Sequence, residues 1–324
     1  MIKKPIRIFE AFAGYGGTAF GLQKANIEHD IVGYSEIDKD AIDLFEFNFP
    51  NITNYGDITK IVPQELPDFD LFSGGFPCQP FSTVGKRLGE VDMRGTLFED
   101  IIRICSHKTP SFILLENVKG LSVGRLKPTF DKIIDSLKDT GYDVRHAILN
   151  SKDYGVPQNR ERLWIFGLYG QLPHGFQLEP PKMPLKYRLK DFLDEHPEIE
   201  LYRSEQQIER IKELHGIIRF DVEEPLCYDY YNRKIRTDGI CMTVTPPEHN
   251  VIRIVEPIQN GKERVRKLSL DEHFRLMGFK MNGTQREINF PPNQTYAKLG
   301  KRAGNGWDIN LVSILARHIF NQLQ

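Results

Sequence analysis

The sequence predicts an α/β protein with an open, mostly parallel sheet and a second, smaller domain. A strand-like run near the N-terminus passes through a glycine-rich turn into a helix, which is how such a sheet usually begins. Acidic residues follow the next strand-like segments, and after residue 170 the composition changes to prolines and mixed charge. We therefore expect a larger domain over residues 1–175, completed by the C-terminal segment 303–324, and a smaller domain over residues 176–302.

The composition is that of a folded soluble chain. It has 324 residues, 40% of them apolar, and a formal net charge of −1, which neither supports nor excludes nucleic-acid binding. No stretch approaches about 18 uncharged apolar residues, and no signal-peptide core follows the N-terminus, so we expect a cytoplasmic protein. Its four cysteines form no Cys-x-x-Cys pair, so neither a disulfide framework nor a metal site is indicated; they are Cys78, Cys105, Cys227 and Cys241.

The first strand is expected over residues 6–12, and the glycine-rich turn over 13–18 leads into a helix. Glycines let a backbone approach a ligand closely, and a helix N-terminus offers free N–H groups. The turn alone leaves nucleotide binding and an ordinary tight turn equally open. Glu36 ends the next strand about 20 residues later, where a ribose is commonly held. Asp57 is a further acidic residue of this kind, although either acid could simply cap a helix.

A cysteine loop follows the strand-like residues 69–72. Residues 75–82 read Gly-Phe-Pro-Cys-Gln-Pro-Phe-Ser, so Cys78 lies between two prolines that stiffen the turn. A thiol presented in this way is typical of a nucleophile, because the thiolate fraction is strongly reactive, whereas a structural cysteine is usually buried. The glycine-containing, basic residues 84–94 then favour a mobile loop that contacts an anionic polymer over a merely solvated loop.

The strand expected at residues 111–115 leads into Glu116 and Asn117, which places an acid near the thiol. Burial at the mouth of a strand can raise the pKa of a glutamate, as a general acid requires. After a helix at 127–140 and a strand at 143–149, Arg160 and Arg162 are two residues apart, so on an extended backbone they point to one side. Two guanidinium groups near a cleft suit an anion or a base edge, and a salt-bridged strand edge is the alternative.

The second domain is expected to be a small twisted sheet with loops. A polar helix is predicted at 204–214, and short strand-like pieces lie near 229–231, 240–245 and 251–255. Basic residues alternate with tyrosines here, a combination that suits phosphates and bases. The basic residues are Arg233, Lys234, Arg236, Lys262, Arg264, Arg266 and Lys267.

One ordered set of motifs extends over nearly the whole chain: the glycine turn, Glu36, Asp57, the Pro-Cys-Gln loop, Glu-Asn-Val at 116–118, Gln-x-Arg-x-Arg at 158–162 and Gly-Asn at 304–305. In this order the motifs resemble those of the DNA cytosine-5 methyltransferases. The resemblance implies a Rossmann-like sheet that binds S-adenosylmethionine, joined to a small target-recognition domain. It implies transfer of a methyl group to carbon 5 of a flipped-out cytosine in a specific double-stranded DNA sequence, through a covalent adduct of Cys78 at carbon 6.

The resemblance also assigns roles to residues. Glu116 would hydrogen-bond or protonate ring nitrogen 3, Asn117 would orient that site, and Arg162, with Arg160 beside it, would support the ring oxygen. The cofactor residues implied are Phe12, Gly14, Gly16, Gly17, Glu36, Ile37, Asp57, Ile58, Pro77, Leu97 and Asn305. The DNA contacts implied or expected are Gln79, Ser82, Lys86, Arg87, Gln158, Arg233, Arg236 and Thr243, with the two arginines after residue 230 reading base edges and Thr243 holding the backbone.

Two departures from the family pattern affect only the cofactor contacts. Residues 304–307 read Gly-Asn-Gly-Trp, where many members have Ser or Ala and then Val, and Ile37 stands where an aromatic residue is common.

The sequence leaves three alternatives open. A tRNA cytosine-5 methyltransferase of the same superfamily is the nearest, although the separate recognition domain favours DNA. A nicotinamide oxidoreductase would have no use for the Pro-Cys pair, and a silent DNA-binding module would not need Cys78. We expect S-adenosylmethionine as cofactor without a metal, double-stranded DNA as substrate, a monomer without membrane contact, and a cognate restriction endonuclease that shares the site without being bound.

Overall fold

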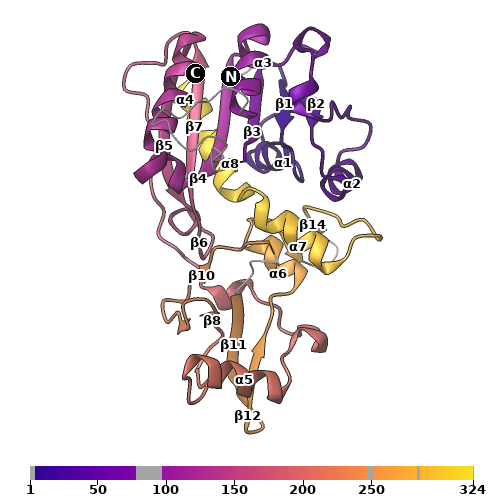
Figure 1. Ribbon diagram of the computed structural model, residues 1–324, viewed down its shortest axis with the longest axis vertical. Coiled ribbons are helices and arrows are strands. Elements are labelled where there is room, and N and C mark those ends of the chain that lie inside the picture. The colour runs from indigo at the N-terminus through magenta and orange to yellow at the C-terminus, as the bar shows by residue number, and fades with distance from the viewer. Residues whose placement is uncertain (1–3, 78–96, 247–251, 283–284, 324) are drawn as a thin grey trace, which may run out of the picture. The chain divides into compact units, whose positions relative to one another are not determined.

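The structure is a computed structural model in which residues 4–77, 97–246, 252–282 and 285–323 are described (Figure 1). By backbone contacts the chain divides into two compact units. Unit 1 comprises Met1–Leu149, Glu161–Pro181 and Leu311–Gln324, and unit 2 comprises Asn150–Arg160 and Lys182–Asn310.

Unit 1 is built on a six-stranded sheet in the order β2-β1-β3-β4-β7-β5. β1, β2, β3 and β4 are parallel neighbours, and β7 runs antiparallel to β4. The carboxyl ends of the parallel strands and the start of β7 therefore lie at one edge. The strands are β1 (Ile6–Ala11), β2 (His29–Ser35), β3 (Leu71–Gly75), β4 (Phe112–Val118), β5 (Tyr142–Asn150) and β7 (Glu161–Tyr169).

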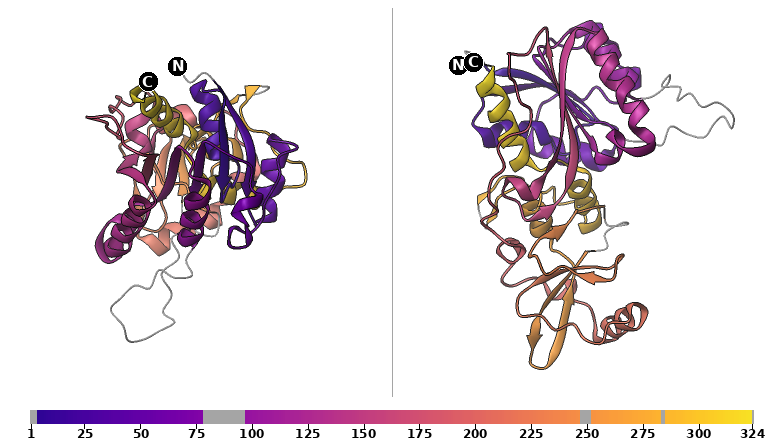
Figure 2. Two further views of the ribbon diagram at one scale, coloured as in Figure 1. Left: turned by 90° about the horizontal axis from the view of Figure 1, so that it is seen from above. Right: turned by 90° about the vertical axis from the view of Figure 1, so that its left-hand side faces the viewer.

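Helices cover both faces of this sheet. Figure 2 shows α4 and α8 on opposite faces. α3 and α4 enclose one apolar cluster with the strands, to which Ile101, Phe130 and Ile113 contribute; each such buried side chain stabilises the fold by about 1.5–3 kcal/mol. α8 packs its Phe320 edge-on against Phe112 of β4. The helices are α1 (Gly17–Ala25), α2 (Lys39–Asn48), α3 (Leu97–Lys108), α4 (Lys127–Asp139) and α8 (Ile309–Gln322).

Unit 2 contains a four-stranded antiparallel sheet in the order β12-β11-β8-β9. α5 (Glu205–His215) packs on it through Ile208 and Ile211, and Ser204 begins this helix with a capping box. The sheet strands are β8 (Leu226–Asp229), β9 (Lys234–Ile235), β11 (Ile252–Gln259) and β12 (Lys262–Arg266). The other elements are β6 (Gln158–Asn159), paired with β10 (Cys241–Met242), the hairpin of β13 (Met281–Asn282) and β14 (Gln285–Arg286), α6 (Leu270–Arg275) and α7 (Tyr296–Asn305).

The α/β fold class predicted from the sequence is confirmed. Residues 150–160 and 303–310, however, group with unit 2, although the sequence assigned them to the larger domain. One physical reason is that the guanidinium of Arg160 donates to the carbonyl oxygens of Val244, Gly304 and Gly306. The division into functional domains stays a prediction. None of the helices in the described part of the chain is long and apolar enough to cross a membrane.

Candidate functional site

The cysteine loop begins at the carboxyl end of β3. Phe76 is buried and Pro77 is exposed, and Pro77 is the last described residue before the loop. Residues 78–96 lie outside the described residues; the expected site residues among them are Cys78, Gln79, Ser82, Lys86 and Arg87. The elements that hold the start of the loop are nevertheless defined.

Asn117 ties the start of this loop to β4. Its Nδ2 donates to the carbonyl oxygen of Phe76 at 2.9 Å, and its Oδ1 accepts from the amide of Val118 at 2.8 Å. The side chain is buried, so its bond to Phe76 is protected from water. A buried carbonyl that lost such a donor would be left unsatisfied, at a cost of about 1–3 kcal/mol. Asn117 therefore fixes the backbone two residues before Cys78.

Glu116 and Arg162 form an ion pair at the same edge. Register brings them there, because Gly75 pairs with Glu116 across β3 and β4, and Val118 pairs with Arg162 across β4 and β7. Nε of Arg162 lies 2.9 Å from Oε1 of Glu116, and the two side chains are only 18% and 11% exposed. This places one acceptor and one cationic donor side by side, which suits a ring that carries a nitrogen next to a carbonyl oxygen.

Arg160 and Gln158 have other partners than those expected. Both belong to unit 2 and are buried. Gln158 donates to the carbonyl oxygen of Leu276 and accepts from the amide of Val244 at 2.7 Å. Arg160 binds three carbonyl oxygens of unit 2, whereas Arg162 pairs with Glu116. The structure thus favours a positioning role for Gln158 and Arg160, and a direct contact with DNA or cytosine would require these bonds to be exchanged.

The glycine turn after β1 has the backbone that close ligand approach requires. Phe12 has a φ of 52°, which is uncommon for a residue with a side chain, and Gly14 and Gly16 have φ values of 57° and 90°. A Cβ on Gly16 would lie 2.7 Å from the Phe49 ring, whereas a Cβ on Gly14 would meet only the Phe12 carbonyl oxygen at 4.0 Å. The turn is therefore closed on one side and open beside Gly14.

Glu36 lies next to this turn, with its carboxylate held by backbone amides. Its oxygens accept from the amides of Gly14 at 3.0 Å, Ile37 at 2.8 Å and Asp38 at 2.9 Å. Ile37 is 74% exposed. Asn54 ties this segment to the next one, because its Nδ2 donates to the Glu36 carbonyl and its Oδ1 accepts from Gly56. The carboxylate offers acceptors suited to hydroxyl groups.

Ile58 and Leu97 join Phe12 around the same apolar cluster. Asp57 precedes Ile58 and caps the short 3-10 helix Ile58–Lys60, which is the ordinary role that the sequence left open for it. The structure thus places Ile58 in this cluster and packs Phe12 and Leu97 against it. The donor and acceptor groups, the stacking face and the open space beside Gly14 together fit an adenosine-containing cofactor.

Sequence reasoning missed Glu10. This buried carboxylate of β1 accepts from the amides of Thr18 at 3.1 Å and Ala19 at 3.0 Å. Burial raises the pKa of Glu10 to about 7, and these two amides oppose the rise. The expectation that the start of α1 offers its N–H groups to a ligand is therefore wrong for Thr18 and Ala19. An acid between apolar residues of the first strand, seven residues before the helix begins at Gly17, was the available signal.

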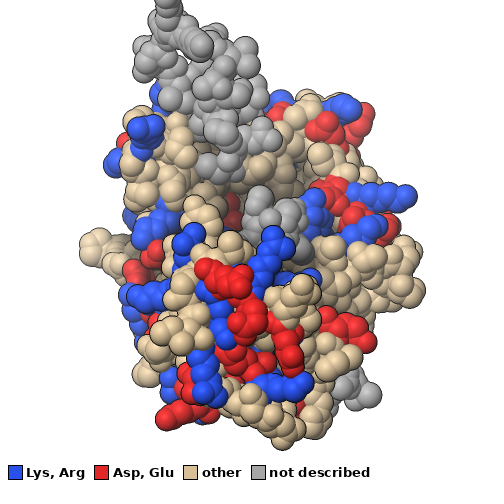
Figure 3. Space-filling model, turned by 60° about the horizontal axis from the view of Figure 1, so that its bottom comes forward, with Lys and Arg blue, Asp and Glu red and all other residues tan. Residues whose placement is uncertain are grey.

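The remaining expected residues lie in unit 2. Thr243 donates its hydroxyl to the carbonyl oxygen of Asn159 at 2.7 Å, and Arg236 is paired with Asp238. Arg233 is exposed in the β8–β9 turn with a φ of 57°, and Asn305 is exposed at the end of α7. On the face shown in Figure 3, basic side chains are interspersed with acidic ones. Within the described residues, no group of three or more His, Cys, Asp or Glu side chains could hold a metal ion.

The chain is similar to known proteins over most of its length. The family model described as C-5 cytosine-specific DNA methylase matches residues 6–321. The chain is 35% identical to the type II methyltransferase M.HaeII of Haemophilus aegyptius, over 99% of this chain and 94% of that protein. It is 34% identical to the type II methyltransferase M.NgoBI of Neisseria gonorrhoeae, over 94% and 90%. The crystal structure of S. pombe Dnmt2 methyltransferase has the same fold, with a TM-score of 0.75 at 22% identity, over 98% of this chain and 99% of that one.

Proposed function

The chain belongs to the C-5 cytosine-specific DNA methylase family, and from this premise we propose which of its residues carry out the reaction. The family transfers a methyl group from S-adenosylmethionine to carbon 5 of cytosine in DNA, through a covalent cysteine adduct. The observation that supports our assignment is that the Asn117 to Phe76 bond and the Glu116 to Arg162 pair meet at the strand end from which the cysteine loop starts.

Cys78 is the proposed nucleophile. Carbon 5 of cytosine reacts poorly by itself, but addition of the Cys78 sulfur to carbon 6 turns the ring into an enamine whose carbon 5 is nucleophilic. S-adenosylmethionine would supply the electrophilic methyl group that carbon 5 takes, and S-adenosylhomocysteine would be the product. The proton at carbon 5 would then pass to solvent as the sulfur–carbon 6 bond breaks, which restores the free thiolate of Cys78.

Glu116 and Arg162 are proposed to stabilise the ring during addition. Negative charge builds on ring nitrogen 3 and on the ring oxygen, so Glu116 would take up a proton as the base enters and donate it to nitrogen 3, while Arg162 donates a hydrogen bond to the oxygen. Their ion pair orients both groups before a base enters, which avoids reorganisation during the reaction. Asn117 would act indirectly, through the loop backbone that it holds.

Unit 1 also carries the proposed cofactor pocket. Phe12 would stack on the adenine ring, Glu36 would accept from the ribose hydroxyls, and the open side of Gly14 would admit the chain that joins them. The other residues of unit 1 proposed to line the pocket are Gly16, Gly17, Ile37, Asp57, Ile58, Pro77 and Leu97. Asn305 belongs to unit 2, and its proposed contact with the cofactor rests on the family resemblance alone.

Unit 2 is proposed to read the DNA sequence. Arg233 and Arg236 have donors suited to base edges in the major groove, and Thr243 would position the backbone. Because M.HaeII and M.NgoBI are named as type II methyltransferases, we further propose that the chain protects one DNA sequence from a restriction endonuclease. The target cytosine would be flipped out of the duplex, because carbon 6 is shielded in stacked DNA.

Covalent trapping tests this proposal. Bisulfite sequencing of DNA from an expressing host first identifies the methylated site, and a duplex with 5-fluorocytosine at that site is then incubated with protein and cofactor. We expect a stable adduct on the Cys78 peptide in mass spectrometry, because fluorine cannot leave as a proton does. Cys78→Ala should abolish the adduct and methyl transfer but retain DNA binding.

Cys105→Ala is the matched control, because Cys105 is buried in α3. Adduct formation should persist in this variant. An adduct on another residue, or methyl transfer by Cys78→Ala, would contradict the assignment of the nucleophile.

A further inference from the structure

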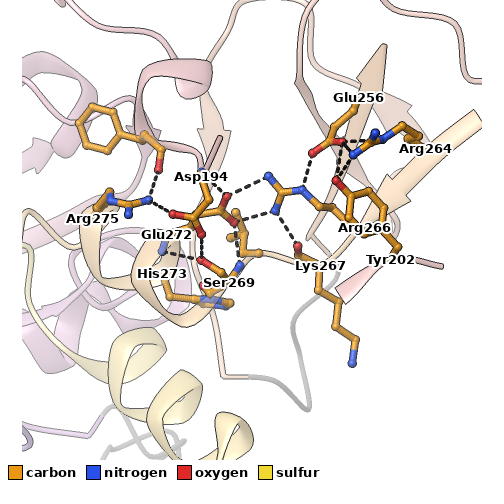
Figure 4. A network of polar contacts seen from close by, with 12 residues as sticks. Asp194, Tyr202, Glu256, Arg264, Arg266, Lys267, Ser269, Glu272, His273 and Arg275 are labelled. Atoms are coloured by element: carbon orange, nitrogen blue, oxygen red, sulfur yellow. Dashed lines mark hydrogen bonds and ion pairs between the residues drawn. The ribbon is translucent and has the colours of Figure 1, made fainter. Parts of the chain in front are cut away.

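The sheet of unit 2 has one face on which the basic residues are neutralised. Arg266 of β12 is completely buried, and its guanidinium lies 2.8 Å from both oxygens of Glu272. Glu256 of β11 pairs with Arg266 and, at 3.0 Å, with Arg264. Figure 4 shows this network as a continuous chain of ion pairs. These arginines hold the sheet together, so they are not available to a polyanion.

The opposite face carries another set of basic residues, Arg203, Arg253 and Lys267. Side chains alternate between the faces of a strand. Because Ile254 pairs with Arg266 across β11 and β12, the residues next in register, Arg253 and Lys267, project from the other face.

The extended segment before α5 adds Arg203 to these two. The amide of Lys267 donates to Leu201 at 3.0 Å, and the amide of Arg203 donates to Val265 at 2.8 Å. Both bonds join this segment to β12. The three cationic side chains therefore come from neighbouring extended segments on one face, and we call them the cation cluster.

The charges of the cation cluster act on one another. Burial first, and then the charges of Arg203 and Arg253, lower the pKa of Lys267. Within the described residues, neither Arg203 nor Lys267 has a carboxylate within ion-pair distance, and the buried Nε of Arg203 has no hydrogen-bond acceptor. Figure 4 shows the Lys267 side chain extending away from the ion-pair network, which it meets only through its carbonyl oxygen.

Two tyrosines limit the movement of these cations. The guanidinium of Arg253 lies 5.5 Å from the centre of the Tyr230 ring, and Nζ of Lys267 lies 5.7 Å from that of Tyr296. Tyr296 is itself fixed, because its hydroxyl donates to the carbonyl oxygen of Leu268 at 2.8 Å. Such cation–π contacts are attractive and favour these positions of the two cations. The side chains are half-buried, so an anion can still reach them.

We propose that the cation cluster binds a phosphate group of the DNA backbone and so positions the duplex on unit 2. This inference rests on the proposed DNA substrate. Arg203 and Lys267 repel each other and have no neutralising acid among the described residues, so an external anion stabilises them, and duplex DNA presents a row of such anions. A phosphate contact fixes register without reading sequence, so these residues would complement Arg233 rather than replace it.

The salt dependence of DNA binding tests the proposal without relying on methyl transfer. Affinity for a fluorescent duplex of about 20 base pairs is measured by anisotropy over a series of NaCl concentrations. A substitution that removes one phosphate contact should reduce the magnitude of the slope of log K against log [NaCl] by about 0.9. We expect such a reduction for Lys267→Gln and Arg203→Gln, and we expect Lys267→Arg to retain the wild-type slope.

Lys262→Gln is the matched control. Lys262→Gln also removes one positive charge near Lys267 in the sequence, but Lys262 is exposed and paired with Glu205. If Lys267→Gln and Lys267→Arg both give the slope of this control, the phosphate site does not exist. A loss of affinity that differs between DNA sequences would also overturn it, because a backbone contact acts on all sequences alike. If the wild-type protein binds DNA with the expected salt dependence but methylates no duplex, the proposed function is wrong. The proposal for the cation cluster is then unaffected.

Discussion

Replacing Asn117 by alanine tests whether the catalytic loop is held from β4. The substitution removes the Nδ2 donor from the carbonyl oxygen of Phe76 and the Oδ1 acceptor from the amide of Val118. Within the described part of the chain, no other side chain donates to the Phe76 carbonyl oxygen. The start of the cysteine loop would then lose its side-chain link to β4, and only the backbone pairing of β3 with β4, which ends at Gly75 and Glu116, would remain.

The size of the effect follows from burial. A buried carbonyl left without its donor costs about 1–3 kcal/mol. If this cost falls on the loop geometry required for attack, kcat decreases by about fivefold to a hundredfold, because about 1.4 kcal/mol corresponds to a tenfold change in rate. Binding of S-adenosylmethionine should remain within about twofold of wild type, since the proposed pocket contacts do not include Asn117.

The assay is single-turnover methylation of the identified duplex with radiolabelled cofactor, together with urea unfolding. Asn48→Ala is the matched control, because Asn48 also donates from Nδ2 to a carbonyl oxygen, that of Leu44, at 2.8 Å. Its bond lies within α2 and links neither β3 nor β4. A single-turnover rate for Asn117→Ala equal to that of Asn48→Ala would refute the tether, whatever the two stabilities are.

Three further predictions concern cofactor, sequence and pH. Phe12→Ala and Glu36→Ala should each weaken calorimetric binding of S-adenosylmethionine by about 1–3 kcal/mol, because they remove a stacking face and an acceptor. Arg233→Ala or Arg236→Ala should change discrimination between target and mismatched duplexes in competition binding, and more for Arg233, because Asp238 already holds Arg236. Burial lowers the pKa of His273 to about 4, from about 6.5 in the unfolded chain. The protein should lose about 2 kcal/mol of stability between pH 7 and pH 5 through this group, and His273→Gln should lose less in urea unfolding.

Each of these predictions has a result that contradicts it. Unchanged affinity in both cofactor variants would rule out the assigned pocket. If neither arginine variant changes the preference for the target site, the assignment of sequence recognition to this part of unit 2 is wrong. An equal fall in stability for wild type and His273→Gln would show that His273 does not titrate as stated, because the stability held by a depressed histidine pKa is present above about 6.5 and is lost as the pH falls towards 4.

Much of unit 1 followed from the sequence because its elements are long and periodic. The strands predicted at 6–12 and 143–149 appear as β1 and β5, and the helix predicted at 127–140 appears as α4. Glu36 and Glu116 each follow a strand in the sequence, which predicted that they lie at one edge of the sheet. Parallel strands have their carboxyl ends at the same edge. The strand predicted at 240–245 is only Cys241–Met242, because the rest of that segment bonds to Gln158 and Arg160 instead of to a neighbouring strand.

The partners of polar side chains could not be predicted in this way. Asn117 and Gln158 were assigned to substrate and DNA from their motifs, but their amides complete bonds to backbone groups that only the folded chain brings near. Glu10 and Asn54 gave no motif, although they hold the glycine turn and the Glu36 segment. Such contacts are set by register between distant strands, which a local pattern does not specify.

The same limit changes the interpretation of basic residues in unit 2. Counting them along the sequence gave seven candidates for DNA contact, yet Arg236, Lys262, Arg264 and Arg266 are ion-paired with carboxylates. Removing Arg236 or Lys262 would take the ion-pair partner from Asp238 or Glu205, and removing Arg264 or Arg266 would take one partner from Glu256. Weaker DNA binding by such a variant would therefore not by itself reveal a contact. Arg233, Lys234 and Lys267 remain from that set, and Arg203 and Arg253 join Lys267 only because the sheet register places them together. Substitution of Arg203 or Lys267 removes charge without stranding an acid among the described residues, so the effect on the salt slope reports on DNA directly.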